Sequence, residues 1–292
     1  MKTIKILPEA DFNEGDVGFF HLEEKTYRSA LGISQSMLKT VMRSPACIEQ
    51  EIRFPREATW SMELGTLAHA AILEPATFGD GVSHYVKPSL YIAEKGEEKL
   101  WNANATVCKK WLDEHSDKPV LSLDEHRSII AMRTNFMGDE FGAMFAKKAI
   151  GEVAIFHRDE ETKAILKGRL DLFAYSEEEV LIGDLKITAD DDDFEFAQKS
   201  ARMKYHVQAA FYIDIVRERL AQIGITNRNI RFLHCTIGSS APHYVEWREL
   251  DAAAVIAGRH LYRAALNEYV KAQETGWFSK IRVVSLPKWA TE

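Results

Sequence analysis

The stretch KGRLDLFAYSEEEVLIGDLKIT, from Lys167 to Thr188, contains two apolar runs joined by a short acidic segment. Each run has the composition of a buried strand, and each keeps one acid near its middle. Asp171 lies in the first run, and Asp184 lies in the second run together with Lys186. Burying a carboxylate is costly unless its charge is compensated. Two acids within strands of this kind therefore need a physical reason.

The pairing of the two runs decides where these acids point. If the runs form a β-hairpin with its tip at residues 176–179, the opposed pairs are Tyr175 with Val180, Phe173 with Ile182, and Asp171 with Asp184. Opposed residues of an antiparallel pair share a face, with Cβ atoms about 4.5–5.5 Å apart. Lys186 lies two residues beyond Asp184 and so on the same face. A slip of one residue would put the acids on opposite faces.

Two carboxylates at this spacing repel each other, and each resists desolvation. A divalent cation would offset both costs, and carboxylate oxygens with open water positions suit Mg²⁺ or Mn²⁺. A lysine beside such a cation can orient an attacking water and stabilise charge that develops on a phosphate. The alternative is that both acids face solvent on a half-exposed sheet.

Composition limits the class of protein. The chain has 292 residues, 46% hydrophobic and 28% charged, as in a soluble globular protein. No apolar run approaches the roughly 20 residues that span a bilayer, and the N-terminal sequence has no signal-peptide core. The cysteines, Cys47, Cys108 and Cys235, are far apart, which argues against a zinc ribbon, a disulfide framework or a four-cysteine iron–sulfur cluster. We expect a cytoplasmic protein without a membrane partner.

The order of elements predicts a mixed α/β fold. Two short helices are predicted within residues 33–52, one helix over 61–74, which ends before Pro75, and one over 96–115. Ser122 with Glu125 forms a capping-box pattern for a helix over 123–136. Strands are predicted over 151–159, 164–176, 179–188, 230–238 and 243–250, with helices over 194–223 and 251–275. We expect one domain over residues 1–292: a mainly helical part, 1–150, and an α/β core, 151–292, with a mixed central sheet flanked by helices.

Asp171 followed by Asp184-Leu185-Lys186 resembles the motif of PD-(D/E)XK nucleases. GRLDLFAY and IGDLKIT are similar to the RecB-type variant, and Gln208 and Tyr212 in QAAFY match its Gln-x-x-x-Tyr element. The wider chain resembles the nuclease domain of exonuclease VIII (RecE) and its phage relatives. The stretches that carry this resemblance are LGISQSMLKTVMRSPA, LGTLAHAAILEP and WFSKIRVVSLPKWA, at residues 31–46, 64–75 and 277–290.

The resemblance implies a restriction-endonuclease-like core and a Mg²⁺-dependent enzyme, with Mn²⁺ as a substitute. It implies digestion of double-stranded DNA from ends, 5′→3′, leaving 3′ single strands for an annealing protein of the RecT type. It also implies a phage or prophage origin in a bacterial cell. The rival functions are a structure-specific or Cas4-like endonuclease on the same fold and a non-catalytic DNA-binding module.

The resemblance also assigns roles to residues. Asp171 and Asp184 would be metal ligands, the Leu185 carbonyl a further ligand, and Lys186 the catalytic lysine. His69 would be the added histidine ligand and Glu152 the acid of the first core strand, while Gln208 and Tyr212 would position the scissile phosphate. The alternatives are a buried helix histidine for His69 and a strand-edge acid for Glu152.

Asp190 to Asp193 follow the second strand directly. They are interpreted either as a second metal site or lid, or as a solvated loop whose acids complement the dipole of the helix that begins near Phe194. The second interpretation is favoured.

The net charge of −7 argues against a simple nucleic-acid binder. DNA binding therefore requires that basic groups gather in one place. A groove leading to Asp184 is predicted from six residues: Lys163, Lys167, Arg169, Lys199, Arg202 and Lys204. One such groove would hold DNA weakly, and the resemblance to exonuclease VIII suggests a closed homo-oligomeric ring, a tetramer, around the duplex.

Overall fold

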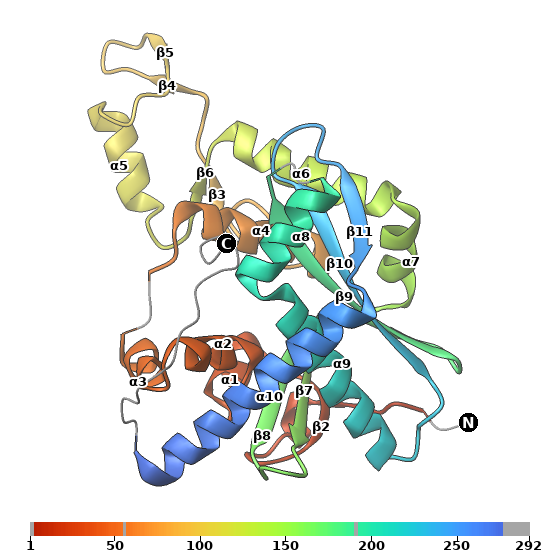
Figure 1. Cartoon of the computed structure of the whole chain (residues 1–292). Coiled ribbons are helices and arrows are strands. Elements are labelled where there is room, and N and C mark those ends of the chain that lie inside the picture. The colour runs from red at the N-terminus through yellow and green to blue at the C-terminus, as the bar shows by residue number, and fades with distance from the viewer. Residues whose placement is uncertain (1–2, 55–56, 190–191, 277–292) are drawn as a thin grey trace, which may run out of the picture.

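The computed structural model describes residues 3–54, 57–189 and 192–276. Its centre is a seven-stranded mixed sheet with the order β1-β2-β7-β8-β9-β10-β11 (Figure 1). The strands are β1 (Ile6–Pro8), β2 (Gly18–His21), β7 (Ile150–Arg158), β8 (Ile165–Tyr175), β9 (Glu179–Thr188), β10 (Asn229–Gly238) and β11 (Val245–Glu249). The predicted mixed α/β fold class is confirmed.

Strands β7, β8 and β9 form an antiparallel meander, and β10 then pairs with β9 in parallel. A parallel neighbour needs a long crossover connection, and α8 (Asp193–Met203) and α9 (Tyr205–Gln222) provide it. The predicted hairpin register is confirmed at Tyr175 with Val180 and at Phe173 with Ile182.

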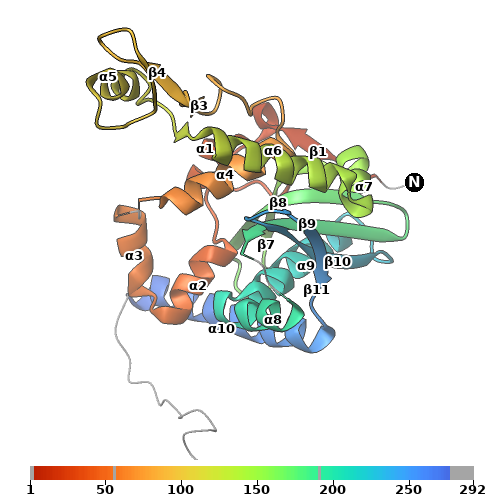
Figure 2. The same cartoon turned by 90° about the horizontal axis from the view of Figure 1, so that it is seen from above.

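Helices cover both faces of the sheet (Figure 2). On one face α9, α10 (Ala252–Thr275) and α2 (Gln35–Arg43) pack over the larger core, which includes Phe173, Phe211 and Leu266. On the other face α4 (Trp60–Leu73), α6 (Leu123–Gly138) and α7 (Glu140–Lys148) enclose a second core around Phe136 and Phe145. Short helices α1 (Glu24–Ser29) and α3 (Ala46–Arg53) complete the N-terminal part, after a single 3₁₀ turn at Glu9–Asp11.

The capping box of α6 forms as predicted. The Ser122 hydroxyl accepts a hydrogen bond from the backbone N–H of Glu125, and the Glu125 carboxylate accepts one from the backbone N–H of Ser122. Two of the N–H groups that every helix start leaves without a helical partner are thereby satisfied.

Two predicted helices were wrong in their extent, and two strands of the central sheet were not predicted. The predicted helix over 194–223 is two helices, because Lys204 takes a left-handed conformation with φ of 62° and turns the chain. In the predicted helix over 96–115 only α5 (Thr106–Glu114) is helical, since Gly96 turns at φ of 81° and β5 (Glu98–Leu100) pairs back on β4 (Leu90–Ile92). Strands β1 and β2 were missed because they are short and depend on pairing with each other and, through β2, with β7.

The hairpin β4–β5 and helix α5 project from the body of the molecule, connected to it by β3 (Tyr85–Val86) and β6 (Val120–Leu121) (Figure 1). Within the described ranges, no helix combines the length and the apolar composition needed to cross a membrane. The stretch at 277–290 that resembles exonuclease VIII lies outside the described residues.

Candidate active site

The central sheet opens at its acidic residues. The β8–β9 ladder ends at Leu172 with Gly183, one pair short of Asp171 and Asp184. The β7–β8 ladder is also interrupted at this level, because no pair joins Glu152 to Asp171 although the ladder continues on both sides. Asp171 is therefore unpaired with both Glu152 and Asp184 at this level of the sheet, whereas Asp184 keeps its parallel pairing with His234 on β10.

Glu152 causes part of this opening. Its φ of 54° is left-handed, a costly conformation for a residue with a side chain. Ile150 and Val153 contact the same core although they are three residues apart in one strand. The alternation of faces along β7 therefore reverses at Glu152, and the reversal directs this side chain into the site.

Asp171 is fixed by a backbone group of the neighbouring strand. Its Oδ2 accepts a hydrogen bond of 2.8 Å from the backbone N–H of Leu185 and lies 3.8 Å from Nδ1 of His69. Burial, and then the nearby Asp184 carboxylate, raise the pKa of Asp171. The Asp171 side chain is 18% exposed, so it is not a solvent-facing acid.

Asp184 is 5% exposed and contacts two polar side chains. Its Oδ1 accepts a hydrogen bond of 2.6 Å from Nε2 of Gln208, and its Oδ2 lies 2.5 Å from Nζ of Lys186. Burial alone would lower the pKa of Lys186, but the Asp184 and Asp171 carboxylates outweigh it and raise the pKa. Lys186 is therefore an ammonium ion, and it also lies 5.4 Å from the ring centroid of Tyr205.

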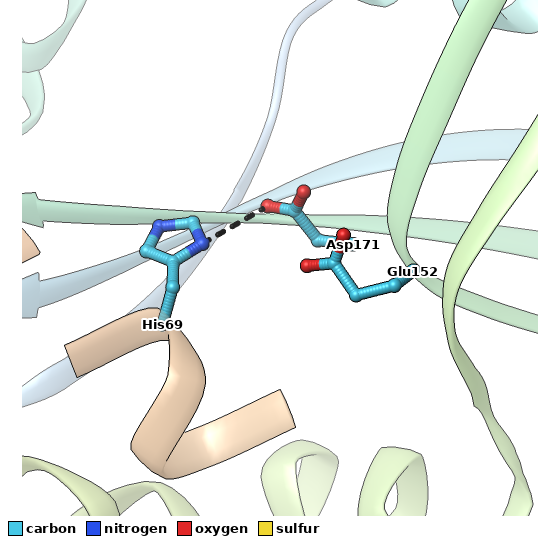
Figure 3. A group of neighbouring side chains, drawn as sticks. All are labelled: His69, Glu152 and Asp171. Carbon is cyan, nitrogen blue, oxygen red and sulfur yellow. Dashed lines mark ion pairs between the residues drawn. The ribbon is translucent and has the colours of Figure 1, made fainter. Parts of the chain in front are cut away.

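His69, Glu152 and Asp171 form a compact group of side chains that can bind a metal ion (Figure 3). One ligand atom from each lies within 4.8 Å of the others. His69 projects from α4 toward Asp171, and its side chain is 30% exposed, so it lies in the wall of the site rather than in the core beneath α4. Burial, and next the Asp171 charge, raise the pKa of Glu152 to about 7.

A cavity of about 1260 Å³ contains nearly all of the predicted site residues. Those that line it are His69, Glu152, Asp171, Asp184, Leu185, Lys186 and Gln208. Tyr212 is absent from this lining among the described residues. Its ring packs beside Gly168 and stacks on Phe232 at 5.8 Å between centroids. The structure thus brings together the predicted site residues except Tyr212, which lies in the core.

The predicted basic groove is only partly present. Lys167 is wrong as a groove residue, because its ammonium is buried and donates to the carbonyls of Tyr27, Arg28 and Ala30 at the end of α1. Arg169 does line the cavity. The others lie in the β7–β8 turn (Lys163), on α8 (Lys199 and Arg202) and at the break after it (Lys204).

The acidic run at 190–193 is described only at its end. Asp192 caps α8 by accepting a hydrogen bond from the backbone N–H of Glu195, and Asp193 forms an ion pair with Arg248. These contacts agree with the helix-capping interpretation. Asp190 and Asp191 lie outside the described residues.

Sequence reasoning missed two residues beside Lys186. Tyr205 lines the cavity below the ammonium, and its position three residues before Gln208 on one helix face could have indicated it. Lys39, on α2, has its pKa lowered to about 8 by burial and by the charge of Lys186. No motif connects a lysine of the N-terminal part with β9, so no signal in the sequence indicated Lys39.

The donor set fits a divalent cation. Carboxylate oxygens dominate it, with one imidazole, a combination that suits Mg²⁺ or Mn²⁺. Burial, and after it a neighbouring carboxylate, raises the pKa of both Asp171 and Glu152, so negative charge is crowded in a poorly solvated place. A bound cation would relieve that crowding and favour the ionised carboxylates.

The sheet order and the acid–lysine arrangement define a member of the PD-(D/E)XK nuclease superfamily. Residues 34–280 match the family described as "PDDEXK-like domain of unknown function (DUF3799)", and the chain belongs to this family. Membership supports a nuclease, and nucleases of this class typically use divalent metal ions.

A solved structure agrees with this fold. The crystal structure of a "Putative exonuclease" from Eubacterium rectale superposes with a TM-score of 0.58 at 13% identity, covering 91% of this chain and 96% of that chain. A Vibrio cholerae protein of solved structure has 9% identity and covers 82% of this chain and 51% of its own, but its TM-score of 0.21 supports no argument. None of the curated proteins matches the chain in sequence.

Proposed function

We propose that this protein is a divalent-metal-dependent exodeoxyribonuclease that digests double-stranded DNA from its ends. The observation that carries the proposal is the convergence of three acids, one imidazole and one ammonium on a single cavity at the opening of the sheet. The cavity, at about 1260 Å³, exceeds the roughly 300–1,000 Å³ of a small-molecule pocket. Its size is suited to part of a polymer strand.

The residues of the site would have different roles in phosphodiester hydrolysis. His69, Glu152 and Asp171, with Asp184 and the Leu185 carbonyl, would hold Mg²⁺. The cation would supply Lewis-acid activation of water and balance the charge that develops on the phosphate. Lys186 stays protonated beside Asp184 and stabilises a phosphate oxygen. Gln208 fixes the Asp184 carboxylate through its 2.6 Å hydrogen bond.

Digestion from ends, with 5′→3′ polarity, rests on similarity rather than on the site. The chain resembles exonuclease VIII in several stretches, and the Eubacterium rectale protein is named for exonuclease activity. The products would be 3′ single strands, which an annealing protein of the RecT type would bind. Phage or prophage origin and a cytoplasmic location belong to the same proposal.

An incubation with labelled DNA tests the proposal. Linear duplex labelled at either the 5′ or the 3′ end is incubated with Mg²⁺, with Mn²⁺ or with EDTA. We expect early release of the 5′ label, late release of the 3′ label and no reaction in EDTA. A covalently closed circle should stay intact, and its cleavage would favour the endonuclease alternative.

A ring of identical subunits would explain how an acidic chain keeps hold of DNA. Enclosure of the duplex slows dissociation without requiring tight contacts, and a head-to-tail interface can close into such a ring. We propose a tetramer. Light scattering of the purified protein would give four times the 33.2 kDa chain mass, whereas a monomeric mass would contradict it.

A further inference from the structure

Arg169 is held by two carboxylates at the edge of the candidate metal site. Its Nε lies 2.5 Å from Oε2 of Glu152, and its Nη2 lies 3.8 Å from Oε1 of Glu74. The side chain is 18% exposed and lines the same cavity as Asp171, which follows it by two residues on β8. The guanidinium is thus positioned but not sealed inside the protein.

Glu152 has two competing partners. It belongs to the group His69, Glu152 and Asp171, whose ligand atoms lie within 4.8 Å of one another, and it also forms the ion pair with Arg169. A carboxylate that coordinates a divalent cation attracts a guanidinium less, and the two cations repel each other. Cation binding and the Glu152–Arg169 ion pair therefore oppose each other.

If Glu152 releases the Arg169 guanidinium, the other charged side chains that line the cavity determine what the guanidinium can bind. Arg169 and Lys186 are the arginine and lysine side chains among the described residues that line it, and Lys186 is already bound to Asp184. The nearby acids, Glu23, Glu24 and Glu74, would repel a phosphate that had no positive partner. A guanidinium presents two parallel N–H donors that match phosphate oxygens.

We infer that Arg169 is a phosphate-binding residue that divalent cation binding releases. In the cation-free chain Glu152 and Glu74 hold the guanidinium. When Glu152 coordinates a divalent cation instead, the Arg169 guanidinium binds a backbone phosphate of the DNA strand in the cavity. The inference rests on the proposed function, and it makes tight DNA binding conditional on the metal that cleavage needs.

The test measures DNA affinity rather than cleavage. In a Lys186→Ala background, binding of an end-labelled linear duplex is followed by fluorescence anisotropy in Mg²⁺ and in EDTA over a range of salt concentrations. Arg169→Gln is compared with Arg231→Gln. Arg231 is a matched control because it also bonds two carboxylates, Glu179 and Glu249, and is not among the residues that line the cavity.

In Mg²⁺ we expect Arg169→Gln to bind DNA about tenfold more weakly, the effect of one charge-assisted hydrogen-bonded contact. In a plot of log affinity against log salt concentration, the slope should become shallower by about 0.9, the change expected for one lost phosphate contact. In EDTA the variant and its parent should bind equally. Arg231→Gln should match the parent in both conditions.

A second readout needs no DNA. In a calorimetric titration with Mn²⁺, Arg169→Gln should bind the cation several-fold more tightly, because the competitor for Glu152 is gone. A purely structural ion pair predicts the reverse: weaker or unchanged cation binding with a lower melting temperature. Arg169→Lys, which keeps the charge, covers the case in which the glutamine variant does not fold. It should bind Mn²⁺ as the parent does and lose part of the DNA affinity in Mg²⁺ only.

Two results would overturn the inference alone, provided that the chain with Lys186 intact degrades DNA: equal loss of DNA affinity in Mg²⁺ and in EDTA, or no loss in either. A chain that neither binds nor cuts DNA ends would overturn both this inference and the proposed function.

Discussion

The backbone N–H of Leu185 donates a 2.8 Å hydrogen bond to the Asp171 carboxylate at the point where β8 and β9 stop pairing. The carboxylate takes the place of a strand carbonyl, so an opened sheet still satisfies its backbone donor. Through this contact β9, the strand that carries Asp184 and Lys186, also orients Asp171 on β8. Buried strands can therefore keep these two acids, because Asp171 replaces a lost ladder contact, Asp184 is hydrogen bonded to Gln208, and both line one cavity.

Replacing Lys186 by alanine should abolish turnover without weakening cation binding. The ammonium contacts Asp184 and is not a metal ligand, so its loss should raise the energy of the transition state and lower kcat. Cleavage of linear duplex should fall by at least about a hundredfold, in the range of a lost electrostatic stabiliser. Calorimetric Mn²⁺ affinity should stay the same or rise. A large loss of cation affinity with normal turnover at saturating metal would contradict this role.

His69→Ala should raise the Mg²⁺ concentration needed for activity and cost little stability. The imidazole stands 3.8 Å from Asp171 in a partly exposed wall, so its loss leaves no buried hole. His84→Ala is the matched control, since His84 is fully buried and hydrogen bonded to Ser83 and His126. The control should lower the melting temperature and leave the Mg²⁺ requirement unchanged. The opposite pattern would show that His69 is a structural histidine.

Gly168→Ala should destabilise the protein, because a Cβ there would lie 2.3 Å from Cε1 of Tyr212. Overpacking of this kind costs about 1–3 kcal/mol, a fall of several degrees in melting temperature. Gly138→Ala serves as the control, since a Cβ at Gly138 meets nothing within 4 Å. Equal melting temperatures for the two variants would contradict the packing of Tyr212 against β8.

Stability at mildly acidic pH should depend on His234. Its imidazole is fully buried against Phe196, Tyr205 and Phe232, and burial lowers its pKa to about 4. An unfolded histidine has a pKa of about 6.5, so between about pH 6.5 and 4 the unfolded chain binds a proton that the folded chain does not. The free energy of unfolding therefore falls as the pH falls through this window, by about 3 kcal/mol in total.

Chemical denaturation at several pH values measures this dependence. His234→Leu should flatten the slope by up to about 1.4 kcal/mol per pH unit, and His260→Asn, at an exposed histidine on α10, is the control. Identical slopes for wild type and His234→Leu would contradict the assignment.

The hairpin at the centre of the site was predictable because alternation and turn length fix a register. Tyr175 pairs with Val180 as expected, and the capping box at Ser122 follows from a local pattern of two residues. The split of the sheet at Asp171 was not predictable. It depends on the left-handed backbone of Glu152, and glutamate has no sequence preference for that conformation.

Errors arose where tertiary contacts decide the role of a side chain. Lys167 was predicted to line the groove because it is a basic residue near the site. Its ammonium instead donates to carbonyls at the end of α1, about 140 positions earlier in the chain. Tyr212 shares a helix face with Gln208, yet Gly168 leaves room for its ring in the core. No local sequence pattern distinguishes a lysine or tyrosine that is buried in this way from one that lines the cavity.

The measurement that tests the central claim most directly compares wild type with Asp184→Ala on end-labelled linear duplex in Mg²⁺ and in EDTA. Asp184 is the acid that Gln208 and Lys186 both contact, and its removal relieves repulsion with Asp171 in the cation-free chain. The account predicts digestion by wild type in Mg²⁺ only, no detectable digestion by the variant, and a variant that still folds without metal. Digestion by Asp184→Ala at near the wild-type rate would contradict it.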